Sequence, residues 1–216
     1  MLMAAGGPSL AADLPQVSHD GMYLAPDTEV AAAYIKPEAD FSGYERIMLL
    51  DAHVAFVKNW QMRHNSSSVN KVTNRDLAAI KSAMAELFRE VFVGEFDGKG
   101  GYSLVDAPDT DVLLLRPAIV DLDVTAPDLP RGSRSYSFSA SAGAATLYLE
   151  VYDSVSGEIL ARVIDRQAAK DVGGVMQWSN KITNRVAAER ILQGWARLLR
   201  ERLDEVRAAA SSAAAQ

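Results

Sequence analysis

The sequence predicts a single α+β domain in which a mixed sheet of about five or six strands packs two main helices on one face. Three observations predict this class. The length of 216 residues and the hydrophobic content of 49% suit one globular core. Several segments alternate apolar and polar residues with the period of a strand, and two longer segments repeat apolar residues at helical spacing.

Changes in composition divide the chain into four parts. Residues 1–12 are rich in small residues and resemble the remainder of a signal peptide. Residues 13–44 are rich in Pro, Asp and Gly and predict an extended arm with a short edge strand. Residues 45–207 hold the α+β core, and the Ala-rich residues 208–216 predict a disordered tail.

The core is predicted to begin with one long strand, because ERIMLLDAHVAFV alternates apolar residues from Met48 to Phe56. A polar loop, NWQMRHNSSSVNK, follows it. Thr73 and Asp76 have the spacing of a capping box, and the apolar stripe behind them predicts a helix that ends at Gly94. The strands YSLV and DVLLLRPAIVDLDVTAP come next, so this strand, helix, strand order predicts that part of the sheet is parallel.

The segment LYLEVYDSVSGEILARVIDRQ predicts a β-hairpin, because apolar and polar residues alternate on both sides of a compact polar turn. Gly157 can take the left-handed conformation that closes such a turn. The last element is predicted to be a helix over residues 183–206, with Trp195 on its inner side.

Composition also limits the function. The chain has no cysteine, which excludes disulfides and thiolate nucleophiles, and its net charge of −6 argues against nucleic-acid binding. No segment reaches the roughly 18 to 20 apolar residues of a membrane helix. The triplet Ser9-Leu10-Ala11 resembles a signal-peptidase site, so we expect Met1 to lie inside a longer signal peptide; the alternative is a frayed Ala-rich terminus.

Three blocks carry a family resemblance: AAAYIKPEADFSGYERIMLLD, VLLLRPAIVDLDVTAP and YDSVSGEILARVIDRQA. Together with the first helix they resemble the bacterial family called domain of unknown function 3313, in matching order over about residues 17–207. The resemblance implies an exported, envelope-associated protein, often a lipoprotein, with no assigned activity. Here LMAAGG resembles a lipobox with glycine in place of cysteine, so we expect a periplasmic protein without a lipid.

Polar residues on the predicted strands are the candidates for chemistry. Asp51 and His53 lie two apart on one strand, and Asp121 and Asp123 lie two apart on another, so each pair is expected on one face. Carboxylates with a histidine can bind a divalent cation or act as acid and base. The alternative is a solvated sheet face.

Two further pairs are candidates for binding. Glu150 and Arg162 lie on the hairpin. Tyr136 and Phe138 alternate with serines in the loop of residues 131–143, which can add a strand to a partner's edge or fold over its own sheet.

These observations predict an exported, noncatalytic binding or assembly module of the cell envelope, with another envelope protein as its partner. The alternative is a hydrolase or cation-binding protein that uses Asp51, His53, Asp121 and Asp123. No motif predicts a cofactor, and the spacing of the histidines does not suit a metal site.

Overall fold

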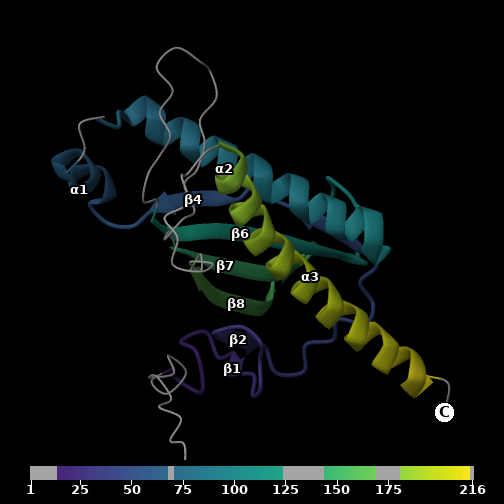
Figure 1. Ribbon diagram of the computed structural model, residues 1–216. Helices are drawn as coiled ribbons and strands as arrows, with labels where there is room; N and C mark the ends of the chain where they lie inside the picture. Colours follow the sequence, from purple (N-terminus) through teal and green to yellow (C-terminus); the bar gives the residue numbers. More distant parts are fainter. Residues whose placement is uncertain (1–13, 68–70, 124–143, 169–180, 215–216) are drawn as a thin grey trace, which may run out of the picture.

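Three long strands form the centre of the sheet, and each pairs antiparallel with the next (Figure 1). They are β6 (Val112–Asp123), β7 (Ala144–Asp153) and β8 (Ile159–Ala168). The computed structural model describes residues 14–67, 71–123, 144–168 and 181–214. Its sheet has eight strands in the order β1-β2-β8-β7-β6-β3-β5, and β4 also pairs with β6. The shorter strands are β1 (Tyr23–Leu24), β2 (Ala32–Ile35), β3 (Arg46–Leu49), β4 (His53–Phe56) and β5 (Ser103–Leu104).

The sheet is mixed, as predicted. β3 runs parallel to both β5 and β6, and β4 runs parallel to β6, whereas β1, β2, β7 and β8 form antiparallel pairs. The α+β class is therefore confirmed, although the sheet has more strands than the five or six expected. β5 is the predicted strand YSLV, whereas β1, with only two residues, is too short for a periodic signal, and one further strand arises because a predicted long strand is divided in two.

The segment predicted as one long strand is divided into β3 and β4. Ile47 and Leu49 are buried in β3, whereas the next buried pair is Ala52 and Val54. The step of three residues between Leu49 and Ala52 interrupts the alternation, so the assignment of Met48 to the buried face was wrong.

Helix α2 (Asn74–Glu95) begins with the predicted capping box. Thr73 accepts a hydrogen bond from the Asp76 amide, and the Asp76 carboxylate accepts one from the Thr73 amide. The helix does not end at Gly94. It continues into a π-helical turn, η2 (Phe96–Gly100), and Gly101 with φ of 67° ends that turn, so the expected C-cap was wrong.

Helix α1 (Trp60–Ser67) lies where the sequence predicts a polar loop. Its sequence has little amphipathic character, so the helical period is not visible in it. Trp60 is buried and stacks on Phe56, with ring centroids 4.6 Å apart, which fixes the start of α1 against the end of β4.

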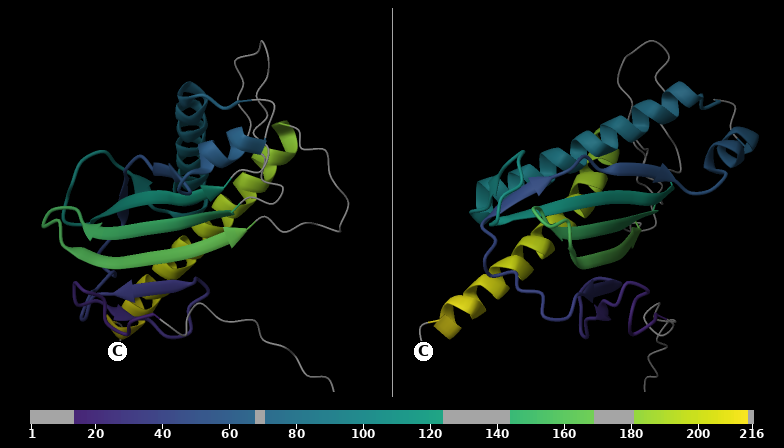
Figure 2. Two further views of the ribbon diagram at one scale, coloured as in Figure 1. Left: turned by 90° about the vertical axis from the view of Figure 1, so that its left-hand side faces the viewer. Right: turned by 180° about the vertical axis from the view of Figure 1, so that it is seen from behind.

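Helix α3 (Lys181–Ala214) crosses the sheet diagonally (Figures 1 and 2). Trp195 on its inner side is buried, as predicted. The helix extends past Arg207, so residues 208–214, which the composition predicts to be disordered, are helical. Alanine has the highest helix propensity of all residues, and a run of it can extend an existing helix at low cost.

Both long helices cover one face of the sheet, as predicted. Residues of α2 and α3 join residues of β3, β4, β6, β7 and β8 in one hydrophobic core. The N-terminal segment packs against the opposite side of the β2 and β8 end, where Met22, Ala32 and Tyr34 form a second, smaller core. No helix in the described part of the chain is long and apolar enough to span a bilayer.

Candidate functional site

The four residues predicted to form an acidic cluster lie along the β4 and β6 end of the sheet. Asp51 is exposed and lies 3.6 Å from Arg89 of α2 as an ion pair. His53 pairs in register with Ala118 of β6, so Asp121 lies three positions further along the strand, about 10 Å away at 3.3 Å per residue. Within the described ranges, no three His, Asp or Glu residues are arranged to hold a metal ion.

A β-bulge separates the two aspartates of β6. The pairing with β7 passes from Val120 to Asp123 with two residues opposite one, and Asp121 takes a left-handed conformation with φ of 50°. Asp121 is consequently exposed, whereas Leu122 is buried in the core. The period-two rule that placed Asp121 and Asp123 on one face does not hold across a bulge.

Glu150 and Arg162 face each other across β7 and β8, as their register requires. The Arg162 guanidinium donates to Glu150 at 3.3 Å and to Asp20 of the N-terminal segment at 2.8 Å. Arg162 is only 8% exposed. The hydrogen bond from Arg162, and a second from Ser18, hold the pKa of Asp20 well below its usual range. These contacts give Glu150 and Arg162 a structural role, since they hold the N-terminal segment against the sheet. Tyr136 and Phe138, the other binding candidates, lie outside the described residues.

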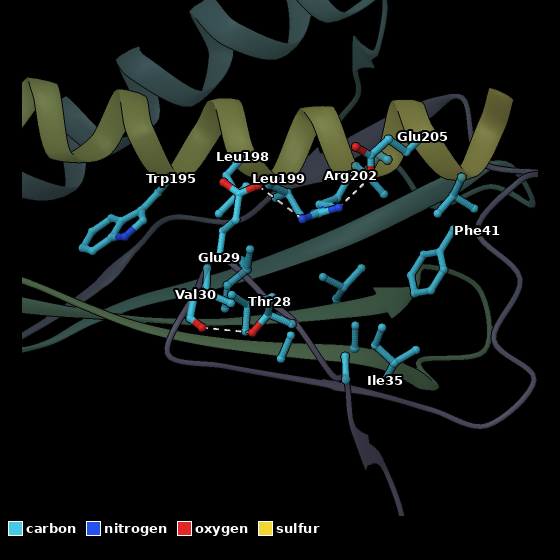
Figure 3. Close-up of a pocket in the computed structure, with 18 of the residues that line it drawn as sticks. Thr28, Glu29, Val30, Ile35, Phe41, Trp195, Leu198, Leu199, Arg202 and Glu205 are labelled. Carbon is cyan, nitrogen blue, oxygen red and sulfur yellow. Dashed lines mark hydrogen bonds and ion pairs between the residues drawn. The ribbon is translucent and has the colours of Figure 1, made fainter. Parts of the chain in front are cut away.

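A pocket lies on the helix side of the sheet, between α3 and the segment 25–30 (Figure 3). α3 crosses the strands diagonally (Figure 1), and the pocket is lined by its residues 195–206, by β2, β6, β7 and β8, and by segment 25–30. Its volume is about 310 Å³. This is twice the roughly 150 Å³ of an apolar cavity that binds benzene, and it is at the small end of ligand pockets.

Apolar side chains make up the floor and walls of this pocket. The floor comes from the central strands, one wall from the C-terminal half of α3, and the other wall from β2 and the residues around it. The floor consists of Leu115, Leu147, Leu149, Val151, Ala161 and Val163. The walls include Leu198, Leu199, Leu203 and Val206 on one side, and Val30, Ala33, Ile35 and Phe41 on the other.

Few polar groups line the pocket, and most of them have partners within the protein. Arg202 of α3 lies 3.4 Å from Glu29, and this ion pair connects α3 to segment 25–30 (Figure 3). Arg202 also donates to Glu205 of the same helix at 2.8 Å. The bond with Glu205 raises the pKa of Arg202 above its ordinary value. The Thr28 hydroxyl donates to the Val30 carbonyl at 3.0 Å.

A buried hydrogen bond fixes the inner end of the pocket. The Trp195 indole N–H donates to the Asp165 carboxylate at 2.7 Å, and the Ala31 amide donates to the same carboxylate at 3.1 Å. Asp165 is 5% exposed and belongs to the helix face of β8. This carboxylate therefore joins α3, β8 and Ala31, the residue before β2, and its oxygens have partners within the protein.

The pocket is suited to binding an apolar group and not to acid or base chemistry. Its lining has no histidine, its carboxylates are exposed, and its one hydroxyl, on Thr28, donates to the Val30 carbonyl. The sequence analysis missed this site, because its walls come from residues 25–41 and 195–206, which are far apart in the chain. Ile35 and Val206 of this lining are both more than a third exposed, which only the structure shows.

Comparisons with solved structures give distant likenesses. The PelC dodecamer from Paraburkholderia phytofirmans aligns at 6% identity with a TM-score of 0.39, covering 78% of this chain and 95% of that chain. A PDZ domain protein from Parabacteroides distasonis gives 10% identity and a TM-score of 0.36, with 76% and 34% covered. A Helicobacter pylori homolog of the neuraminyllactose-binding hemagglutinin gives 8% identity and a TM-score of 0.35, with 81% and 93% covered.

No curated protein matches the chain. One family model matches most of it, over residues 20–199, and that family is described as a protein of unknown function, DUF3313. This range includes all three sequence blocks on which the resemblance was based, as well as α2 and most of α3. The chain therefore belongs to the DUF3313 family.

Proposed function

We propose that this protein is a noncatalytic binding module of the bacterial cell envelope, and that it holds an apolar chain in the pocket between α3 and segment 25–30. The observation that carries the proposal is the pocket itself, which is apolar on its floor and both walls and has room for roughly a dozen carbon atoms. Its polar groups lie at the rim or are already hydrogen-bonded. An alkyl chain needs no hydrogen-bond partner, so it suits such a lining.

The proposed location rests on the sequence. The small-residue segment before residue 13 resembles a signal-peptide end. We propose that the protein acts in the periplasm or at the outer membrane. Fractionation of cells that produce the full-length native gene product tests this, and recovery from the cytosol alone would exclude it.

Displacement of a neutral fluorescent dye, N-phenyl-1-naphthylamine, tests the binding function. The dye is titrated into the protein and then displaced by alkyl maltosides of increasing chain length, each below its micelle-forming concentration. We expect saturable binding and about fourfold tighter displacement per added methylene, until the chain fills the pocket. Absence of saturable binding to the folded protein would refute the proposal.

A pocket-filling variant makes this test specific. Ala33 of β2 lines the pocket, and Ala33→Phe would fill part of it. Ala118 of β6 does not line it and lies on the opposite face of the same sheet, so Ala118→Phe serves as the matched control. We expect the first variant to weaken dye binding at least tenfold and the second to leave it within twofold. If both variants bind the dye equally well, the dye does not bind in this pocket.

A further inference from the structure

The charges at the rim of the pocket are unequal. Of the residues that line it, Asp27, Glu29 and Glu205 are acidic, and Arg202 is the one base. The Glu29 and Glu205 side chains are 70% and 63% exposed, so their carboxylates face the solvent at the entrance. The screening length at physiological salt is about 8 Å, so the charges that line this one entrance act together on an ion there.

The single guanidinium at the rim is already paired. Arg202 is within ion-pair distance of both Glu29 and Glu205, from two different nitrogens. An anionic head group would have to displace one of these carboxylates and then remain close to it. A cationic head group meets no such competition, because it can join the same carboxylates and lower the excess negative charge.

The pocket interior favours an alkyl chain over a polypeptide segment. A peptide that entered the pocket would bring backbone N–H and C=O groups, and each needs a partner when it is removed from water. Apart from the charged residues, the lining has two polar side chains, Thr28 and Trp195, and each donates its hydrogen bond within the protein. The lining therefore offers few side-chain partners for a peptide backbone.

We propose that the ligand is a single-chain amphiphile with a cationic head group, whose alkyl chain fills the pocket and whose head lies among Asp27, Glu29 and Glu205. This inference rests on the proposed function and adds the class of ligand to it. It also gives the Glu29–Arg202 contact a second role beyond joining α3 to segment 25–30, since it withholds Arg202 from anionic head groups.

Three probes with the same decyl chain test the head-group preference. Decyltrimethylammonium, decyl maltoside and decyl sulfate each compete with N-phenyl-1-naphthylamine below their micelle-forming concentrations, in low salt and again in 0.5 M salt. We expect the ammonium to displace the dye at about one fifth of the maltoside concentration or less, and the sulfate to be the weakest. The differences should shrink in high salt, because the rim is exposed.

A double variant changes the rim without changing the interior. With Glu29→Gln and Glu205→Gln together, Arg202 loses both ion-pair partners, and we expect the sulfate to become the tighter ligand. The control neutralises Glu86 and Asp106, which are exposed and do not line the pocket, as Glu86→Gln with Asp106→Asn. The control variant should bind the three decyl probes in the same order of affinity as the unchanged protein.

The outcomes separate this inference from the proposed function. If no decyl probe displaces the dye, the apolar-chain function fails, and the head-group inference fails with it. If the three probes compete equally, or if the sulfate is tightest in the unchanged protein, the pocket binds apolar chains but the cationic preference is wrong. If the double variant still prefers the ammonium, the preference arises from charges outside the rim, and the inference is overturned.

Discussion

The indole of Trp195 donates a hydrogen bond of 2.7 Å to the carboxylate of Asp165, and both side chains are buried. This contact joins the middle of α3 to β8. The same carboxylate accepts hydrogen bonds from the Ala31 amide and the Gln167 side chain. A buried carboxylate with three donors is stable only as long as those donors stay in place.

Asp165→Asn is expected to reduce the free energy of unfolding by about 2 to 3 kcal/mol, because an amide presents a donor where the carboxylate accepts, and the remaining bonds lose their charge assistance. Urea denaturation followed by circular dichroism measures this. Asp106→Asn, on an exposed side chain, is the control and should change stability by less than about 0.5 kcal/mol. Equal effects of the two variants would contradict the role of Asp165.

Asp20 holds the N-terminal segment against the sheet through its ion pair with Arg162. Since its pKa is depressed in the folded protein, its contribution to stability is fully present above the ordinary pKa of an aspartate, about 4, and is lost as the pH falls below that value. We expect Asp20→Asn to lower stability at pH 7 by about 1 to 2 kcal/mol and to remove this part of the acid dependence.

Thermal melts from pH 7 to pH 2.5 measure the acid dependence of Asp20. The difference in Tm between the unchanged protein and Asp20→Asn should be largest at pH 7 and should shrink below pH 4. Amide hydrogen exchange adds a local readout, in which Met22 and Tyr34 of the small core exchange faster in the variant. A constant difference in Tm over the whole range would refute the assignment.

Two ion pairs between α2 and α3 differ in burial and form a matched comparison. Arg200 donates to Glu95, which is 7% exposed, whereas Arg185 donates to Glu90, which is 64% exposed. Burial raises the pKa of Glu95, but hydrogen bonds from Arg200 and Lys99 outweigh it and leave the pKa below its ordinary value. Glu95→Gln should cost about 2 kcal/mol and Glu90→Gln less than about 1 kcal/mol. If chemical denaturation gives similar losses of unfolding free energy for the two variants, burial does not determine the contribution of these ion pairs.

The left-handed conformation of Asp121 predicts an unusual order of variants at the β6 bulge. Asp121→Val should reduce stability by about 1 to 2 kcal/mol, since a β-branched side chain clashes with the backbone at φ of 50°. Asp121→Gly removes that clash and should leave stability nearly unchanged. Differential scanning calorimetry checks the order. A larger loss in the glycine variant than in the valine variant would mean that the carboxylate itself is required.

The sequence was sufficient to predict those structural features that depend only on neighbouring residues. The capping box of Thr73 and Asp76 lies within four residues, and Gly157, with φ of 70°, closes the hairpin turn from within the turn itself. Asp153 accepts hydrogen bonds from the Val155 and Ser156 amides of the same turn. Each of these contacts depends on neighbours along the chain, so the residue pattern alone is sufficient to predict it.

The pattern failed where distant segments determine the geometry. The bulge at Asp121 follows from the pairing of β6 with both β4 and β7, and the residues near it carry no pattern that predicts the change of register. The pocket depends on a contact between Glu29 and Arg202, which lie 173 positions apart. Single-sequence periodicity shows which side of an element is apolar but not which other element covers it, so the candidate site could not be predicted.

The diagonal course of α3 divides the helix into two environments. Ala188 and Leu192 of its N-terminal half belong to the central core, whereas Leu198, Leu199 and Val206 of its C-terminal half line the pocket. A ligand of the proposed kind would therefore add apolar contacts to this half of the helix. The local stability of residues 198–206 should therefore rise when the ligand binds beneath them and should depend on the ligand concentration.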